Sequence, residues 1–515
     1  MFARYFHTLK HLKAKQIFFQ LYYKSRAVAR RFAGYQPRFN KSAKGQQLHT
    51  ISWIPASESW HKNTFTFLNQ AVTFEKINWD YALNGKLWTY NLNYFDFLNQ
   101  PSTTKAEGLA LMQQYSAQLP LLKNANEPYP ISLRCINWIK FNTQHQIRNA
   151  QIDNSLYSQY TMLFNSIEYH LLGNHLLENA FSLYIGGIYF NDEKLHKKGF
   201  ALITKELKEQ ILSDGAHFEL SPMYHQIILN RLLDCINFAQ AQDEKKILAT
   251  YALQMLGWLH SITLKNGAIP LLNDAAKNIA PRSQEIFDYA VRLNLLSTTT
   301  PFGASGYRKW ELSGAEMIID VGPLGPSYIP GHAHADFFNF ELYDQSPIIV
   351  DSGISTYEKN ERRELERSTS SHNTVSISYK NQIDTWGGFR VGKRANVQLL
   401  KDNASEIIAE HNGYAPFVHR RSWKKTSNDE VQISDVLNPE ASGELHFHFH
   451  PNVNLQVENN RVHANNWTLT FSNLKNLHLQ KYLHAEQFNV LIEASKIVIE
   501  FKGGIVTTIA RTKTQ

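Results

Sequence analysis

Three histidines and one aspartate within residues 328–375 have the types and spacing to build a reactive or metal-binding site. His332 and His334 are two residues apart, so in an extended strand both side chains point to the same face. Asp351 follows an apolar run, and His372 follows a charged stretch. Two imidazoles and a carboxylate form a donor set that zinc accepts, and the remaining imidazole is suited to proton transfer. The segment therefore predicts a metal site with a spare histidine beside it.

The chain has two halves that differ in the spacing of their apolar residues, and these halves must position the segment. Between about residues 50 and 296, apolar residues recur every three or four positions, which predicts stacked helical hairpins. From about residue 306 onward, short alternating runs rich in β-branched residues predict the strands of a β-sandwich. We expect an N-terminal arm at 1–45, a helical domain at 46–300 and a β domain at 301–515.

The basic charge of the chain is concentrated in the N-terminal arm. The arm holds 11 of the 53 Lys and Arg residues and no Asp or Glu, so the rest of the chain carries 42 basic against 45 acidic side chains. Apolar residues at helical spacing, among them Phe6, Leu9, Phe18 and Leu21, predict a basic amphipathic helix. Such a helix suits an anionic membrane surface or a partner protein, and it can equally pack on the body with its basic face in water. Nucleic acid is not an expected partner, because the basic stretch contains no recognisable binding module.

Composition and segment lengths limit where the protein can be located in the cell and whether cysteines can hold its fold together. No window has the roughly 18 consecutive apolar residues of a membrane-spanning helix. The arm also lacks the apolar core and small-residue cleavage site of a secretory signal. We therefore expect a cytoplasmic protein, peripheral at the inner membrane through its arm, with a periplasmic location as the alternative. The two cysteines, Cys135 and Cys235, make a disulfide framework an unlikely basis for the fold.

Five motifs, taken together and in order, resemble the heparinase II/III family of polysaccharide lyases. They are WTYNLNYFDFL (88–98), YPISLRCINW (129–138), GNHLLENAFSL (173–183), DGAHFELSPMYH (214–225) and GHAHADFFNFEL (331–342). The resemblance covers most of the chain from about Trp88. It implies an incomplete α/α toroid followed by an antiparallel β-sandwich, with a catalytic cleft between them.

The reaction that the resemblance implies is β-elimination on a uronic acid. Removal of the weakly acidic C5 proton requires that the neighbouring carboxylate be neutralised, that a base reach C5 and that an acid protonate the leaving O4. The resemblance assigns Asn174 to the substrate carboxylate and Tyr224 and His332 to the acid and base roles, in an order left open. Pro222 can begin a helix, which would put Tyr224 near its positive end, where the pKa of the phenol is expected to fall. The structural alternatives are a helix cap for Asn174 and a packed aromatic for Tyr224.

The resemblance also assigns His334, Asp351 and His372 to a metal site. One divalent ion is expected, with zinc as the first choice and manganese as the alternative. The site would hold the strand that carries His332.

Four further residues are candidates for binding the substrate. Arg134 can bind a carboxylate through two hydrogen bonds. An ion pair inside the helical domain would account for this arginine equally well. His175 and Glu178 follow Asn174 within one helical turn, and Asn91 lies in the motif at 88–98.

A second run of histidines, His446, His448 and His450 in LHFHFHP, also invites a metal hypothesis. Their alternation with phenylalanine is more typical of a strand with one polar and one buried face.

The sequence thus predicts a lyase that cleaves a uronic-acid-containing glycan by β-elimination. The missing signal and the basic arm place it in capsule, O-antigen or exopolysaccharide metabolism of the bacterial cell envelope. The near-neutral body favours a less sulfated acidic polysaccharide. A uronosyl C5-epimerase, which needs the same proton transfers, is one alternative, and a non-catalytic glycan-binding or assembly protein is the other.

Overall fold

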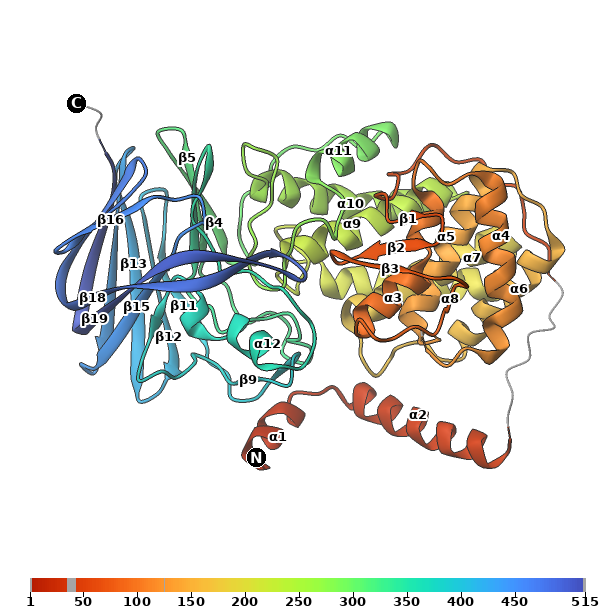
Figure 1. The fold of residues 1–515 in the computed structure, drawn as a ribbon, viewed down its shortest axis with the longest axis horizontal. Coiled ribbons are helices and arrows are strands. Elements are labelled where there is room, and N and C mark those ends of the chain that lie inside the picture. The colour runs from red at the N-terminus through yellow and green to blue at the C-terminus, as the bar shows by residue number, and fades with distance from the viewer. Residues whose placement is uncertain (1, 35–42, 125, 513–515) are drawn as a thin grey trace.

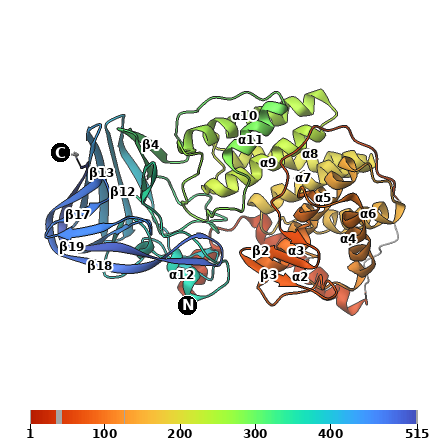
Figure 2. The same ribbon diagram turned by 45° about the horizontal axis from the view of Figure 1, so that its top comes forward.

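The structure, a computed structural model, describes residues 2–34, 43–124 and 126–512. Its first half is helical and its second half is built of antiparallel strands. Figures 1 and 2 show the two halves side by side, with the N-terminal helices α1 and α2 lying along one face of both. The two-part organisation that the change of sequence pattern predicts is therefore present.

The helical half is arranged around α7, which packs on α5, α6, α8 and α9. Nearly every residue of α7 is buried, including the polar Asn174, Glu178 and Asn179, so the helix lies inside the helical half. The helices of this half are α3 (Lys86–Tyr94), α4 (Lys105–Gln118), α5 (Pro128–Gln144), α6 (Ala150–Phe164), α7 (Gly173–Phe190), α8 (Glu193–Gln210), α9 (Pro222–Phe238), α10 (Gln242–Ile262) and α11 (Ser283–Arg292), with 3-10 turns at Asp96–Asn99 and Leu119–Leu121.

A small antiparallel sheet, not expected from the helical pattern, precedes these helices. It consists of β1 (Trp60–His61), β2 (Thr64–Phe67) and β3 (Gln70–Thr73). The run TFTF alternates polar and aromatic residues, and Phe65 and Phe67 turn inward onto the helical core.

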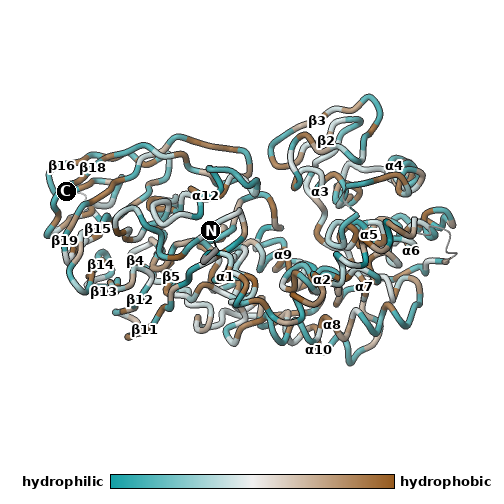
Figure 3. Tube along the Cα trace, turned by 90° about the horizontal axis from the view of Figure 1, so that it is seen from below, coloured by the Kyte–Doolittle hydropathy of each residue, from teal (hydrophilic) through white to brown (hydrophobic). Residues whose placement is uncertain are grey.

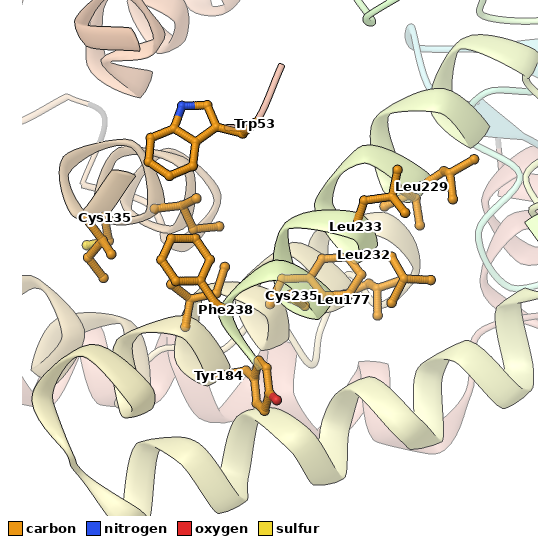
Figure 4. Close-up of a cluster of buried hydrophobic side chains, with 14 of the residues drawn as sticks. Trp53, Cys135, Leu177, Tyr184, Leu229, Leu232, Leu233, Cys235 and Phe238 are labelled. Carbon is orange, nitrogen blue, oxygen red and sulfur yellow. The ribbon is translucent and has the colours of Figure 1, made fainter. Parts of the chain in front are cut away.

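The core of the helical half contains both cysteines. Cys135 on α5 and Cys235 on α9 are buried and free, and Figure 4 shows them within one apolar cluster that includes Leu177 and Phe238. Burial raises the pKa of the Cys135 thiol to about 12, so this cysteine acts as a small apolar side chain.

The β half contains two main sheets that share one core. One sheet has the order β4-β5-β6-β7, and the other has the order β11-β12-β13-β14-β19-β18-β17-β16, with β15 paired to β19 and β8. Side chains from both sheets form one buried cluster, as in a sandwich. The strands are β4 (Tyr307–Leu312), β5 (Ala315–Asp320), β6 (Phe340–Asp344), β7 (Ser346–Ile349), β8 (Val375–Ser376), β9 (Thr385–Trp386), β10 (Arg390–Val391), β11 (Val397–Asp402), β12 (Glu406–Tyr414), β13 (Phe417–Ser427), β14 (Glu430–Asn438), β15 (Ser442–His448), β16 (Leu455–Glu458), β17 (Arg461–Ala464), β18 (Trp467–Gln487) and β19 (Val490–Arg511).

The β18–β19 hairpin connects the two halves. Its strands are 21 and 22 residues long, and Figure 1 shows them extending from the sandwich toward the helices. At the tip, Asn69 Nδ2 donates to the Phe488 carbonyl at 2.9 Å, and Asn489 Nδ2 donates to the Leu68 carbonyl at 2.8 Å. The tip, residues 486–490, is therefore anchored on the turn between β2 and β3.

The N-terminal arm forms α1 (Phe2–Leu9) and α2 (Ala14–Phe32) and packs on both halves. On α1, Arg4 makes two hydrogen bonds to Asp384 of the β half, at 2.7 and 2.8 Å. On α2, the buried Gln16 donates to carbonyls on both sides, those of Leu171 and Tyr328. Figure 3 shows the arm crossing this face of the molecule with apolar and polar residues mixed along it. No helix among the described residues is long and apolar enough to span a bilayer.

Candidate active site at the domain junction

Asn174, Tyr224 and His332, which lie far apart in the sequence, meet where the helical and β halves join. Asn174 is the second residue of α7 and Tyr224 is the third of α9. The Tyr224 and His332 rings are in contact, with centroids 3.9 Å apart and planes tilted by 33°, and Asn174 Nδ2 lies 3.4 Å from His332 Nε2. The three side chains therefore face one another across the junction.

The His-x-His pair lies in a loop between β5 and β6 and not in a strand, contrary to the prediction. Both rings nevertheless turn toward one carboxylate, that of Asp274. His332 Nδ1 is 2.8 Å from one oxygen of Asp274, and His334 Nε2 is 2.9 Å from the other. The two rings therefore face the same way because both bind Asp274, and not because they lie in a strand.

Asp274 fixes the tautomer of His332. The carboxylate accepts the Nδ1 proton, which leaves the lone pair on Nε2 facing Asn174 and Glu219. Arg363 of α12 (Glu361–Glu366) donates to both oxygens of Asp274, at 2.6 and 2.7 Å. Although burial opposes it, Arg363 and the two histidines hold the pKa of Asp274 well below its usual value. Asp274 is thus an anion that orients the imidazole ring of His332.

Asn174 is held in place by Glu219. Its backbone N–H donates to Glu219 Oε1 at 3.1 Å and its side-chain amide donates to Oε2 at 2.7 Å. The carboxylate therefore binds one of the free N–H groups at the start of α7, where the helix dipole favours an anion. The second amide hydrogen of Asn174 remains available for an acceptor in front of His332.

Gly173 makes this arrangement possible. Its φ is +56°, and a Cβ at this position would lie 2.5 Å from Glu219 Oε1 and 2.9 Å from Ile329 Cδ1. A side chain here would displace the carboxylate that holds Asn174.

Tyr224 occupies the first turn of α9, as Pro222 predicts, and its N–H donates to the capping hydroxyl of Ser221 at 3.3 Å. The predicted fall in its pKa was wrong, because burial raises the pKa of Tyr224 and outweighs the lowering by Tyr357 and Arg363. Its hydroxyl lies 3.3 Å from that of Tyr357. The phenol is therefore protonated at neutral pH, which suits it to donate a proton.

Two of the predicted substrate contacts lie inside the helical half. Arg134 is fully buried and donates to Gln159 at 2.6 Å and to the Asn93 carbonyl at 3.0 Å, which favours the structural interpretation. Glu178 is fully buried, and its nearest charge is Arg231, whose Nε lies 3.6 Å from it. Neither side chain is accessible to a polymer.

The other two predicted contacts are partly exposed. His175 lies next to Asn174, and its pKa is raised, because Glu168 at 3.3 Å outweighs burial. Its ring also packs against Tyr129, with centroids 4.6 Å apart. Asn91 donates to the Leu87 carbonyl at 2.8 Å within α3. His175 is the better placed of the two, because it follows the residue that faces His332.

The predicted metal residues are close together but do not converge. His372 Nδ1 donates to Asp351 at 2.7 Å, and the His334 and His372 rings lie 5.3 Å apart. Their ligand atoms do not form a group within 4.8 Å. Two buried nitrogens, His334 Nδ1 and His372 Nε2, have no hydrogen-bond partner and suit a metal, whereas Asp351 is engaged by His372 and Asn339. The metal site stays a prediction, and these two unpartnered nitrogens are the observation that supports it.

The sequence reasoning missed Glu219, Asp274, Tyr357 and Arg363. Glu219 lies inside the motif at 214–225, five residues before Tyr224, and its position there was the one available signal. Asp274 and Arg363 lie in polar stretches that read as ordinary loop, and only the fold brings them to His332.

The fold and site define a two-domain protein of the toroid and sandwich class, and comparison with known families places it more closely. The Heparinase II/III N-terminus model matches residues 135–292, and the Heparinase II/III-like, C-terminal model matches residues 296–514. The chain belongs to the heparinase II/III family.

Curated relatives and a solved structure agree with this assignment. The chain is 25% identical to a heparin-sulfate lyase of Bacteroides stercoris over 318 residues, 55% of this chain and 46% of the relative. It is 25% identical to the heparin-sulfate lyase of Pedobacter heparinus over 383 residues, 67% of this chain and 55% of the relative. The chain thus spans about half the length of the curated relatives it matches. A crystal structure of heparinase III has a TM-score of 0.66 at 16% identity, covering 85% of this chain and 80% of that one, which confirms the toroid and sandwich fold.

Proposed function

We propose that the protein is a polysaccharide lyase that cleaves a uronate-containing glycan by β-elimination. The observation that carries the proposal is the grouping of Tyr224, His332 and Asn174, with His332 oriented by Asp274 so that its Nε2 faces Asn174. The activity named for the relatives from Bacteroides stercoris and Pedobacter heparinus supports it.

The geometry supports a division of roles in the proposed reaction. His332 Nε2 takes the C5 proton, while the free amide hydrogen of Asn174 binds the uronate carboxylate and stabilises the charge that develops there. The protonated hydroxyl of Tyr224 donates to O4 as the C4–O4 bond breaks. The products are a shortened chain and a new end with a C4–C5 double bond.

A glycan panel tests this proposal. Purified full-length protein is incubated with unsulfated and sulfated uronate polymers, and ultraviolet absorbance reports unsaturated ends. We expect absorbance with at least one polymer, most strongly with a less sulfated one, because the body of the chain carries 42 basic and 45 acidic residues. Tyr224→Phe should lose activity by about 10²-fold or more while keeping the fold. Full activity in this variant would contradict the role of Tyr224.

The same incubation in deuterated water separates the alternatives. Deuterium at C5 without chain scission would identify a C5-epimerase, in which the proton returns from the opposite face. Binding without either reaction would identify a glycan-binding protein. Double bonds formed without C5 exchange support the lyase.

We further propose that the arm attaches the protein to the inner face of an anionic membrane, within capsule, O-antigen or exopolysaccharide metabolism. In support, α1 and α2 pack on the body and yet leave large apolar side chains exposed beside basic residues. The most exposed of these are Phe6, Leu9, Phe18, Leu21, Val28 and Phe32. Sedimentation with anionic but not zwitterionic vesicles, lost in Phe18→Ser/Leu21→Ser, is the expected result. A fully soluble periplasmic protein would contradict the location.

We also propose that His334, Asp351 and His372 hold a structural divalent ion, zinc before manganese. The support is the pair of unpartnered nitrogens on His334 and His372. Burial lowers the pKa of His334 to about 4, so its imidazole is neutral and can act as a ligand. The ion would steady the loop that carries His332. Metal analysis of wild-type protein and His372→Ala tests this.

A further inference from the structure

A second group of ligand-type side chains lies outside the site described above. His450, His484 and Glu486 are the only three His, Cys, Asp or Glu residues among the described parts of the chain whose ligand atoms all lie within 4.8 Å of one another. His450 follows β15, and the other two lie near the end of β18. The alternating histidines of LHFHFHP do not form a site by themselves, since only His450 joins this group.

The distances within the group suit a shared cation better than hydrogen bonds. Glu486 Oε1 lies 3.6 Å from His450 Nε2 and 3.7 Å from His484 Nε2. Hydrogen bonds between nitrogen and oxygen are shorter, about 2.7–3.2 Å. Two ligands about 2.0–2.1 Å from a tetrahedral zinc ion are about 3.3 Å apart, close to the spacing found here.

The surroundings of His484 leave its Nε2 as an unsatisfied acceptor. The Tyr482 hydroxyl donates to the Phe449 carbonyl at 2.9 Å, so toward His484 Nδ1, 3.5 Å away, it can only accept a proton. In the neutral imidazole the lone pair is then on Nε2, which is buried and has no hydrogen-bond partner. A buried lone pair facing a carboxylate oxygen is unfavourable unless a cation lies between them.

The other two ligands are compatible with a metal. Lys277 Nζ pairs with Glu486 Oε2 at 2.7 Å, which orients the carboxylate and leaves Oε1 for a second cation. His450 Nδ1 lies 3.3 Å from the N–H of Asn452 in an exposed turn. Coordination through Nε2 places the imidazole proton on Nδ1 and gives up this long contact.

We propose that His450 Nε2, His484 Nε2 and Glu486 Oε1 bind one divalent transition-metal ion, with zinc as the first choice and water completing the coordination. The donor set of two imidazoles and one carboxylate is the one that such ions take. This site shares no residue with the one predicted at His334, Asp351 and His372.

The bound ion would fix the part of the β18–β19 hairpin that reaches the helical half. Lys277 N donates to the Glu486 carbonyl at 2.7 Å, so one ligand residue is also bonded to the helical half. Phe488, two residues further on, packs against Tyr357, which contacts Tyr224. The ion would thus stabilise the contact between the halves from the β side.

Metal uptake by matched variants tests the proposal. Full-length protein is stripped with a chelator, exposed to zinc chloride, desalted and assayed for bound zinc by mass spectrometry. Glu486→Gln and His450→Gln each remove one ligand, and glutamine keeps nearly the same shape as glutamate. His478→Gln is the control, because His478 lies on the same strand and faces Glu500 at 3.3 Å, outside the group. Circular dichroism checks that each variant is folded.

We expect wild-type protein and His478→Gln to bind a zinc equivalent that Glu486→Gln and His450→Gln lose. Zinc should also raise the thermal midpoint of the first two by a few degrees more than that of the other two, which keep only the site at His334, Asp351 and His372. Zinc that is lost only in His372→Ala would belong to the other site and would overturn the proposal. Undiminished uptake in Glu486→Gln, or no uptake by the wild type, would overturn it as well.

Discussion

At the scale of single residues, the site depends on one buried carboxylate. Asp274 accepts from His332 and His334 and pairs with Arg363, so it links the loop that precedes α11 to two segments of the β half. Its role is positional, because it sets the tautomer of His332 and carries no proton itself. An aspartate that pairs with an arginine in this way is stable as an anion at all ordinary pH values.

Asp274→Asn should reduce turnover by about 10³-fold, because an amide can stabilise the wrong tautomer of His332. It should also lower the free energy of unfolding by about 3–5 kcal/mol, since Arg363 loses its partner. Kinetics and urea unfolding measure the two effects. Asp435→Asn is the matched control, because Asp435 is buried in the same way between His419 and Arg421 but lies outside the site. Equal losses of turnover per folded molecule in both variants would contradict the positioning role.

Glu178 gives a pH-dependent prediction. Burial, only partly offset by Arg231, raises the pKa of Glu178 from 4.5 to about 7. The folded protein therefore binds more protons than the unfolded chain between these values, and its stability falls as the pH rises through them, by about 3 kcal/mol at most from this group.

Glu178→Gln removes the proton that titrates. Relative to the wild type, the variant should gain stability as the pH goes from 5 to 8, and urea unfolding at both values measures the change. A difference that is the same at both pH values would show that Glu178 is ionised throughout.

At the scale of elements, the first turns of α7 and α9 position the site residues Asn174 and Tyr224. α7 begins at Gly173 with Glu219 bound to the backbone N–H of Asn174, and α9 begins at Pro222 with Tyr224 in its first turn. These starts are written locally, as a Gly-Asn pair and a Ser-Pro pair. The start of α9 could therefore be predicted from Pro222, whereas the roles of Asn174 and Tyr224 were implied by the family resemblance and remain predictions.

Gly173→Ala should reduce activity sharply, because the new Cβ would meet Glu219 and displace Asn174. Gly267→Ala is the matched control, since its φ of +83° carries a similar backbone cost but nothing lies within 4 Å of its Cβ. Gly267→Ala should lose about 1 kcal/mol of stability and no activity, whereas Gly173→Ala should lose more stability, because of its contacts, and should also lose activity. Equal activity in the two would show that the contact with Glu219 is unimportant.

Two other elements could not be predicted from the local sequence pattern. The segment at 358–368 is so rich in charge that it reads as a solvated turn, yet it forms α12 and buries Arg363 against Asp274. The loop carrying His332 and His334 reads as a strand because of its alternation. In both cases the local structure depends on an ion pair with Asp274, which lies about 60 to 90 residues away. The hydrophobic periodicity of a short segment gives no sign of so distant a partner.

At the scale of the whole molecule, the change from helical to alternating pattern predicted the two halves, and the comparisons confirm the fold. The pattern did not predict how the halves are joined. The β18–β19 hairpin closes the junction from the β side, and the arm closes it from the other face. Both contacts connect residues hundreds of positions apart, and neither has a sequence signature.

Phe488→Ala should loosen this junction. The side chain is buried in a cluster with Met223 of α9 and Leu271, so truncation should cost about 3–5 kcal/mol and make the hairpin tip more sensitive to protease. Activity should also fall, because Tyr357 loses a neighbour. Leu491→Ala, at an exposed position of β19, is the control and should change none of these. Unchanged proteolysis and activity in Phe488→Ala would show that the hairpin does not hold the halves together.

The docking of α1 has a consequence for how the chain is made. Arg4 is synthesised 380 positions before its partner Asp384. At roughly 5–20 residues per second, the arm waits on the order of 20 to 80 s before that contact can form. Throughout this interval its apolar side chains are free to meet a chaperone or a lipid surface. The nascent chain thus presents this basic segment well before the rest of the protein exists, and the position of the ribosome when the segment first binds can decide where the finished protein resides.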